Sequence, residues 1–200
     1  AVEEMGARLR AGDKSASTHY GYAFALMSAG RAPDALEALR PAVTDLPRQT
    51  NINLLQAQLL LATGMKDAAL ALFDETTRLN PRSAPAVVLN ARALLEVGKP
   101  AEARQLLLGF DPAHGQLPEQ HQLLSEASRQ LNNVGDAQFE AANYELARGD
   151  LRSALTQVDA GLRLSTLSEQ ERTRLNAQRE QLIARIPRAV LSDLARQQRR

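Results

Sequence analysis

Three glycines are equally spaced along the chain, at Gly30, Gly64 and Gly98, with a period of 34 because 64 − 30 and 98 − 64 are both 34. Around each glycine the same residue types recur: alanine at the seventh position before, leucine at the fourth before, alanine at the fifth after and a large apolar residue at the ninth after. These positions hold Ala23, Ala57 and Ala91; Leu26, Leu60 and Leu94; Ala35, Ala69 and Ala103; and Leu39, Phe73 and Leu107. A repeated internal order of this length predicts one small structural unit stacked several times, because each unit can bury its apolar face only against its neighbours.

The residue types indicate what each unit is. Glycine after a helical stretch can adopt the left-handed conformation that ends a helix, and Pro33 suits the first turn of the helix that follows. Alanine at the recurring offsets lets two helices approach closely, while leucine and phenylalanine fill the remaining space. This pattern and its period are typical of the tetratricopeptide repeat, which is a pair of antiparallel helices. We therefore predict an all-α tetratricopeptide-repeat solenoid of about 10–12 helices.

The predicted layout has a short N-terminal helix and linker in residues 1–15 and a solenoid in residues 16–200. Pro47 and Pro81 close the first two units of the solenoid. The predicted segments are repeats at 16–49, 50–83 and 84–117, irregular helices at 118–148, and a final hairpin with capping helices at 149–200.

The regular order breaks in the second half of the chain. We place a turn at Gly135, which is too close to Gly149 for a pair of helices to fit between them. The single helix between these two glycines is therefore expected to serve two hairpins. Ser168 and Glu171 have the spacing of a capping box, which predicts the start of a last long helix. That helix is expected to run to about Arg185, and a short terminal helix is expected around Val190.

Composition excludes several classes of function. The chain has no cysteine, which rules out disulfides and thiolate metal sites, and no apolar run is long enough to insert into a membrane. From Arg148 to Arg200 there are eleven arginines against six acidic residues, but this segment has no lysine and no aromatic residue for stacking on bases. We expect no nucleic-acid partner and interpret the segment as a solvated or docking surface. The chain begins at Ala1 without methionine, which we interpret as a domain of a longer protein.

The three histidines do not form a recognisable metal or catalytic site. His114 and His121 are separated by a loop and a helix start, without a nearby third ligand, so we expect two exposed polar side chains. His19 is expected to be a half-buried packing residue at the start of a helix. We therefore predict no catalytic residue, no metal site and no cofactor in this chain.

The first helix of each repeat is the best candidate for binding a partner, because these helices line the inner face of a tetratricopeptide array. Counting from the repeat register, ten residues are predicted to face a partner-binding groove: Tyr20, Phe24, Met27, Asn51, Leu54, Gln58, Leu61, Val88, Arg92 and Leu95. Arg92 could anchor a carboxylate or a backbone carbonyl of the partner. In the alternative, a tightly curled array places Leu54, Leu61, Val88 and Leu95 in the core.

Two later segments are more particular than a generic repeat. They are the sequence Glu-Ala-Ala-Asn-Tyr-Glu-Leu-Ala-Arg-Gly-Asp-Leu at 140–151 and the sequence Arg-Leu-Asn-Ala-Gln-Arg at 174–179. Together with the three upstream repeats, they resemble the C-terminal region of the β-barrel assembly-enhancing protease family. That resemblance covers residues 16–185. Such proteins have a zinc metallopeptidase domain followed by a tetratricopeptide domain, in the periplasm of Gram-negative bacteria.

The resemblance implies a non-catalytic recognition domain. The zinc-binding His-Glu-x-x-His motif of the peptidase domain is absent from this chain, since no histidine here is followed by glutamate. The implied location is the periplasm, and the implied partners are β-barrel outer-membrane proteins, the barrel assembly machinery and the protein's own peptidase domain. The alternative is a cytoplasmic scaffold or adaptor unrelated to proteolysis.

Overall fold

The computed structural model describes residues 1–111 and 117–186, and this part of the chain contains eleven α-helices and no β-strand. The expected all-α solenoid of 10–12 helices is therefore confirmed. The chain divides into two compact units, Ala1–Gly98 and Lys99–Arg200. Among the described residues, no helix is both long and apolar enough to cross a bilayer.

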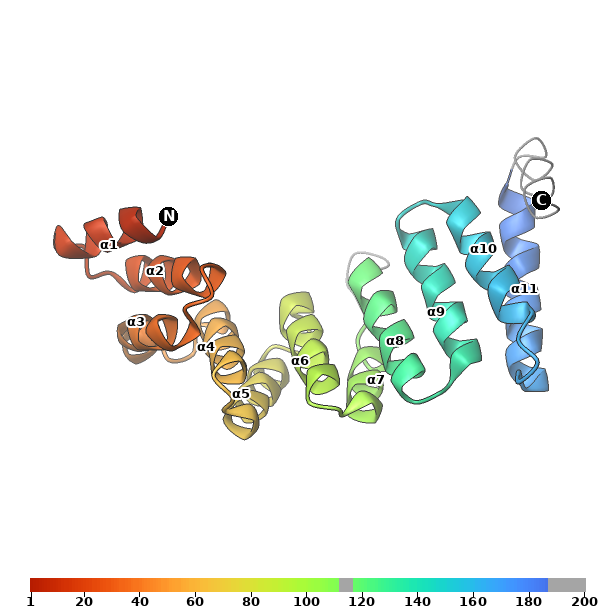
Figure 1. The fold of residues 1–200 in the computed structure, drawn as a ribbon, viewed down its shortest axis with the longest axis horizontal. Helices are drawn as coiled ribbons and strands as arrows, with labels where there is room; N and C mark the ends of the chain where they lie inside the picture. The colour runs from red at the N-terminus through yellow and green to blue at the C-terminus, as the bar shows by residue number, and fades with distance from the viewer. Residues whose placement is uncertain (112–116, 187–200) are drawn as a thin grey trace. The chain divides into compact units, whose positions relative to one another are not determined.

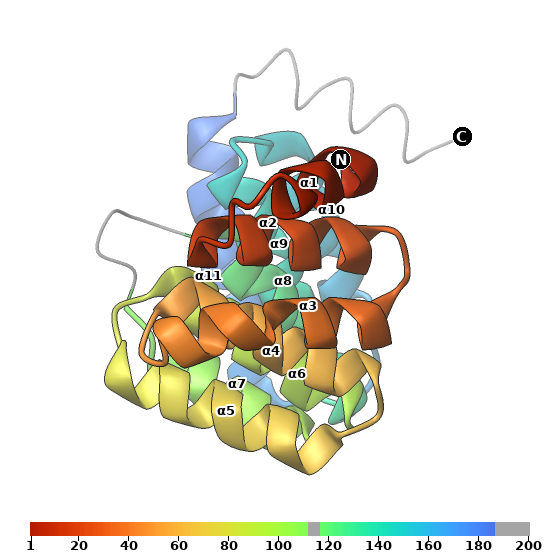
Figure 2. The same cartoon turned by 90° about the vertical axis from the view of Figure 1, so that its left-hand side faces the viewer.

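The N-terminal unit is built from helices that each pack against the next helix along the chain (Figure 1). Helices α2 and α3 form one antiparallel hairpin and α4 and α5 form a second, while α1 lies against α2 (Figure 2). The helices of this unit are α1 (Val2–Arg10), α2 (Ala16–Ser28), α3 (Ala32–Asp45), α4 (Thr50–Ala62), α5 (Lys66–Leu79) and α6 (Ala84–Glu96).

The periodic glycines end the first helix of each repeat in the left-handed conformation. Their φ angles are 73° at Gly30, 84° at Gly64 and 80° at Gly98. A Cβ atom added at any of the three would meet no other atom within 4 Å. Backbone conformation, and not crowding, is therefore the reason for glycine at these turns.

The periodic alanines and large apolar residues form the core of the N-terminal unit. Ala23, Ala35 and Leu39 pack in one cluster with residues of α4, and Phe73 packs in a second cluster with Ala57 and Ala93. The alanines bring the helices close, and the larger side chains fill the space between them, as the repeat pattern predicts. Leu60 differs from its counterparts because it is only half-buried.

The C-terminal unit contains α7 (Pro100–Leu108), α8 (Pro118–Gln130), α9 (Val134–Ala147), α10 (Leu151–Leu162) and α11 (Glu169–Arg185). Each helix packs against the next, and α11 also contacts α9. Buried apolar residues of α9, α10 and α11, among them Ala142, Val158 and Leu175, form the core of this unit.

The turn between α8 and α9 lies at Asn132, and the expected turn at Gly135 is wrong. Asn132 follows Gly98 by one further period and has a φ of 59°. Asparagine is one of the few residues other than glycine that visits this left-handed conformation. Gly135 is instead buried in the first turn of α9, where an added Cβ would lie 2.7 Å from Cδ of Glu171. A fourth turn therefore continues the original period.

The period changes only after Asn132, where the next left-handed glycine follows by half a repeat. That glycine is Gly149, with a φ of 82°, and 149 − 132 = 17 is half of 34. As expected from the sequence, the helix between the two turns belongs to two hairpins: α9 packs against α8 before it and against α10 after it. At this point the chain adds a single helix before the next turn, whereas each regular repeat adds a pair of helices.

The last described helix begins at the predicted capping box. The backbone N–H of Glu171 donates to the Ser168 hydroxyl, and the Glu171 carboxylate accepts from the backbone N–H of Ser168 at 2.8 Å. The Ser168 hydroxyl and N–H hold the pKa of Glu171 below its usual range. The helix ends at Arg185, as predicted. The short helix expected around Val190 lies outside the described residues.

Candidate functional site

One face of the N-terminal unit carries the first helices of three repeats. Helix α4 contacts both α2 and α6, so these three helices lie in a row. Phe24, Gln58 and Arg92 occupy the same position in the three successive helices, one period apart. Their side chains therefore form one column along this face, which we call the first-helix face.

The N-terminal end of the first-helix face is aromatic. Tyr20 and Phe24 stack with their ring centroids 6.5 Å apart and their planes 15° from parallel. Phe24 is 50% exposed, which is unusual for a phenylalanine, and Met27 beside it is half-buried. An exposed stacked pair with an adaptable methionine can accept an apolar side chain of a partner.

The C-terminal end of the first-helix face is hollowed and charged. A hollow of about 190 Å³ lies between α4 and α6, with Phe73 in its lining. Arg92 and Glu96 on α6 are exposed at this hollow, and neither forms an ion pair with any residue in the described part of the chain. These charges are consequently available to a partner. The hollow is lined by Gln58, Leu61, Ala62, Phe73, Leu89, Arg92, Ala93 and Glu96.

The structure distributes the ten predicted groove residues over three levels of exposure. Phe24, Asn51 and Arg92 are exposed, whereas Leu54 and Leu95 are buried. Leu54 packs in the same cluster as Phe73, because α4 is surrounded by α2, α3, α5 and α6 and buries more of its surface than an end helix. Leu54 and Leu95 are therefore core residues and do not face a groove, in agreement with the alternative given for them above. The half-buried residues are Tyr20, Met27, Gln58, Leu61 and Val88.

The prediction omitted the corresponding residues of a fourth repeat. Gln122, Glu126 and Arg129 on α8 lie one period after Val88, Arg92 and Leu95. They line a hollow of about 340 Å³ in the C-terminal unit, together with Tyr144 of α9 and Gln157 of α10. The signal that could have found them is Asn132, which continues the period without a glycine.

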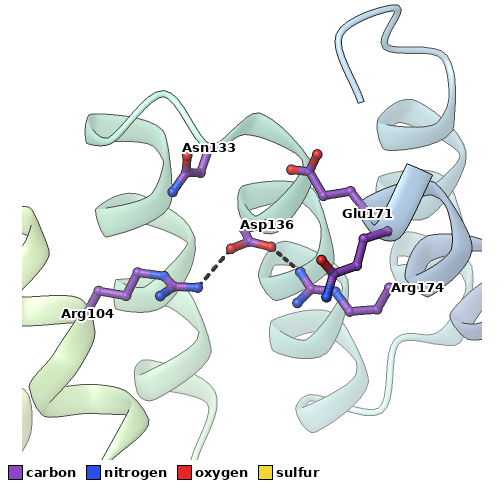
Figure 3. Close-up of a pocket in the computed structure, with 6 residues that line it drawn as sticks. Arg104, Asn133, Asp136, Glu171 and Arg174 are labelled. Atoms are coloured by element: carbon purple, nitrogen blue, oxygen red, sulfur yellow. Dashed lines mark hydrogen bonds and ion pairs between the residues drawn. The ribbon is translucent and has the colours of Figure 1, made fainter. Parts of the chain in front are cut away.

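A polar pocket of about 450 Å³ lies elsewhere in the C-terminal unit (Figure 3). Asp136, in the first turn of α9, accepts hydrogen bonds from Arg104 of α7 at 2.8 Å and from Arg174 of α11. The Arg174 guanidinium also lies 4.0 Å above the centre of the Phe139 ring. The pocket is lined by Arg104, Asn133, Asp136, Gln170, Glu171 and Arg174.

The histidines are engaged in local contacts. His19 is half-buried, as expected, and its Nδ1–H donates to the Ala38 carbonyl at 3.1 Å. The prediction that His121 is exposed is wrong. Its Nδ1–H donates to Glu140 at 2.8 Å, and both side chains are largely covered. His114 lies outside the described residues. Across the ranges 1–111 and 117–186, no group of three acidic or histidine side chains could hold a metal ion.

Many arginines of the last helices already have partners. Arg179 pairs with Asp159 at 2.7 Å, and Arg172 donates to the carbonyls of Leu162 and Leu164 at 3.3 Å. The positive charge read from the sequence is thus partly used to hold the C-terminal unit together.

Comparison with known proteins identifies the fold. A sequence profile described as tetratricopeptide repeat matches residues 60–127. The crystal structure of a tetratricopeptide repeat protein from Parabacteroides merdae matches with a TM-score of 0.60 at 12% identity, over 90% of this chain and 78% of that one. The fold is a tetratricopeptide-repeat solenoid.

Two further solved structures are similar. YrrB, described as a tetratricopeptide protein with an unusual peptide-binding site, matches with a TM-score of 0.50 at 14% identity, over 88% of this chain and all of that one (100%). Yeast Tom70 matches with a TM-score of 0.54 at 15% identity, over 92% of this chain and 43% of that one. No curated protein sequence matches. At these identities the similarity establishes the tetratricopeptide fold, which generally serves protein interaction and not catalysis.

Proposed function

We propose that this tetratricopeptide domain recognises a segment of a partner protein on the first-helix face of its N-terminal unit. The observation that carries the proposal is the combination of a half-exposed stacked aromatic pair at one end and an exposed Arg92 beside a hollow at the other. Exposed apolar surface that is contiguous and bordered by polar residues is typical of interaction sites, and the stacked pair and the hollow lie on one face.

Each end of the face has a separate role in this recognition. Tyr20 and Phe24 bury an apolar side chain of the partner, and aromatic anchors of this kind dominate binding energy at protein interfaces. Arg92 donates to a carboxylate or to a backbone carbonyl of the same segment. Leu54 and Leu95 support the face from below, because they are buried.

The wider biological role that we propose follows the resemblance in residues 140–151 and 174–179. The domain would be the non-catalytic part of a periplasmic metalloprotease, recognising β-barrel outer-membrane proteins or their assembly machinery. The zinc of such an enzyme would belong to a peptidase domain outside this chain. A cytoplasmic adaptor is the competing role, and the gene separates the two: a signal peptide and an upstream His-Glu-x-x-His motif would support the protease.

Photo-crosslinking tests the binding face. A photoreactive amino acid replaces Gln58 at the centre of the face, and crosslinked proteins are identified in living cells. Phe24→Ala and Arg92→Gln should each reduce crosslinking to the same partner by about fivefold or more, since both remove anchor contacts.

Two matched controls separate binding from general surface effects. Leu79→Ala removes a similarly exposed apolar side chain from the end of α5, and Arg78→Gln removes an exposed arginine of the same helix. Both controls should leave crosslinking unchanged. Equal losses from the controls and from the face variants would contradict the proposed face.

A further inference from the structure

The polar pocket of the C-terminal unit contains two arginines that one carboxylate holds in place. Arg104 comes from α7 and Arg174 from α11, and both point at Asp136 of α9 from opposite sides (Figure 3). The Asp136 side chain is only 19% exposed, whereas those of Arg104 and Arg174 are 33% and 41% exposed. Asp136 therefore lies at the bottom of the arrangement, and the guanidinium groups remain accessible from solvent.

Hydrogen-bond donors in the pocket are left unused. Each arginine contacts Asp136 through Nη2, which leaves further N–H groups of a five-donor guanidinium free of partners in the described part of the chain. Within residues 1–111 and 117–186, the side-chain amides of Asn133 and Gln170 have no hydrogen-bond partner, and both line the pocket. Phe139 beneath Arg174 fixes the plane of that guanidinium, so its remaining donors keep a defined direction.

The charges in the pocket limit what it can accept. Arg104 and Arg174 contribute two positive charges, and Asp136 and Glu171 contribute two negative ones. Oε2 of Glu171 is occupied by the Ser168 N–H and hydroxyl at 2.8 and 2.6 Å. A ligand with one negative charge can gain charge-assisted hydrogen bonds from the unused donors. Because the resident charges balance, the second charge of a phosphate gains no net attraction and adds to the cost of removing the ligand from water.

We propose that this pocket binds a single carboxylate group, presented by an aspartate or glutamate side chain of a partner protein. The carboxylate accepts from the free N–H groups of Arg104 and Arg174 and from the amide of Asn133. This site belongs to the C-terminal unit and uses none of the residues of the first-helix face, so it does not depend on the function proposed above.

A pair of small probes tests the pocket in the full chain. N-acetyl-glutamate methylamide presents the carboxylate without charged ends, and N-acetyl-glutamine methylamide is its neutral counterpart. In a two-dimensional NMR titration, the glutamate probe should give saturable shifts of the Asn133 side-chain amide and of the Arg174 Nε–H signal. The glutamine probe should give no saturation over the same concentrations. Saturation by both probes would overturn the requirement for a carboxylate.

Variants distinguish the pocket from general attraction to positive charge. Arg104→Gln should weaken binding of the glutamate probe about fivefold, because hydrogen bonds between charged groups are stronger than those between neutral groups. Arg104→Lys should give a smaller loss of affinity. Arg152→Gln removes an exposed arginine of α10 outside the pocket and should change nothing. Equal losses from Arg104→Gln and Arg152→Gln would overturn the site. Inorganic phosphate that binds as tightly as the glutamate probe would overturn the single-charge requirement.

Discussion

The two units of the molecule differ in whether ion pairs join their helices. In the N-terminal unit, neighbouring hairpins meet mainly through alanines and through large apolar residues such as Phe73 and Leu39, and polar links such as that from the Asn90 amide to the Thr77 hydroxyl are uncharged. In the C-terminal unit, helices are also joined by charged side chains: Asp136 links α7, α9 and α11, and Arg179 links α11 to α10.

The difference coincides with the change in repeat period. Where the original period holds, each interface can reuse the same apolar pattern. Helix α9 must instead pack as the second helix of one hairpin and the first helix of the next, so a single repeated pattern cannot satisfy both sides. Directional hydrogen bonds, such as that from His121 of α8 to Glu140 and that from Gln178 of α11 to Asn143, specify how this shared helix is placed. Regular packing and specific polar contacts are thus two solutions to one stacking problem.

The largest expected effect concerns the apolar core of the N-terminal unit. Phe73 is fully buried, so Phe73→Ala should lower the free energy of unfolding by about 3–5 kcal/mol through lost burial and a remaining cavity. Urea denaturation measures the loss, and hydrogen exchange locates it. Amide protection in α4–α6 should fall more than in α9–α11. A uniform fall in both units would show that the two regions do not differ in the way described.

The polar link of the C-terminal unit should have a smaller effect. Asp136→Asn removes the charge shared by two arginines and should cost about 1–2 kcal/mol of unfolding free energy, because the site is partly shielded from water. Glu37→Gln removes an exposed ion pair with Arg40 within α3 and should cost no more than about 0.5 kcal/mol. Similar costs for the two variants would contradict a structural role for Asp136.

The left-handed turns provide a paired test of the period. Gly64→Ala forces a side chain into the left-handed region and should cost about 1–2 kcal/mol. Asn132→Gly should stabilise the protein by about 0.5–1 kcal/mol, because it relieves the same strain at the fourth turn. Thermal unfolding of both variants measures whether each substitution lowers or raises the stability. A destabilising Asn132→Gly substitution would mean that the asparagine side chain makes a contact that outweighs the strain.

The smallest expected effect is local and depends on pH. Hydrogen bonds from the hydroxyls of Thr18 and Ser15, and from Arg8, hold the pKa of Asp13 below its usual range. Because the folded pKa is depressed, the contribution of Asp13 is complete above its ordinary pKa of about 4 and is lost as the pH falls below that value. The amide signals of Ser15 and Thr18 should report the loss on acidification. They should stay unchanged over the same range in Asp13→Asn.

The regular part of the fold was predictable because the residues that define each repeat lie close together in the sequence. The glycines, alanines and Phe73 act through neighbours at fixed distances along the chain, so a one-dimensional pattern reports them. The fourth turn has an asparagine, Asn132, in the left-handed conformation, so a pattern defined by glycine places this turn at Gly135 instead.

The details of the surface could not be predicted from the sequence, because they depend on how the helices pack in three dimensions. Whether Leu54 lies in the core or in the groove depends on how far α4 is rotated against its neighbours, and sequence spacing does not define that rotation. The pocket around Asp136 joins side chains from α7, α9 and α11, which are distant in sequence and meet only after the array has stacked. Its residues form no local motif that could have revealed it.

Stacking of chain neighbours also affects how the protein can form. Nearly all helix contacts join an element to the next one in sequence, so no early helix has to wait for a distant one. A polypeptide of this kind can acquire structure hairpin by hairpin while it is still emerging from a ribosome or a translocation pore. The contacts of α9 with α11, like those of α2 with α4 and of α4 with α6, are the exceptions in timing, because each pair can meet only after the intervening helix has been made.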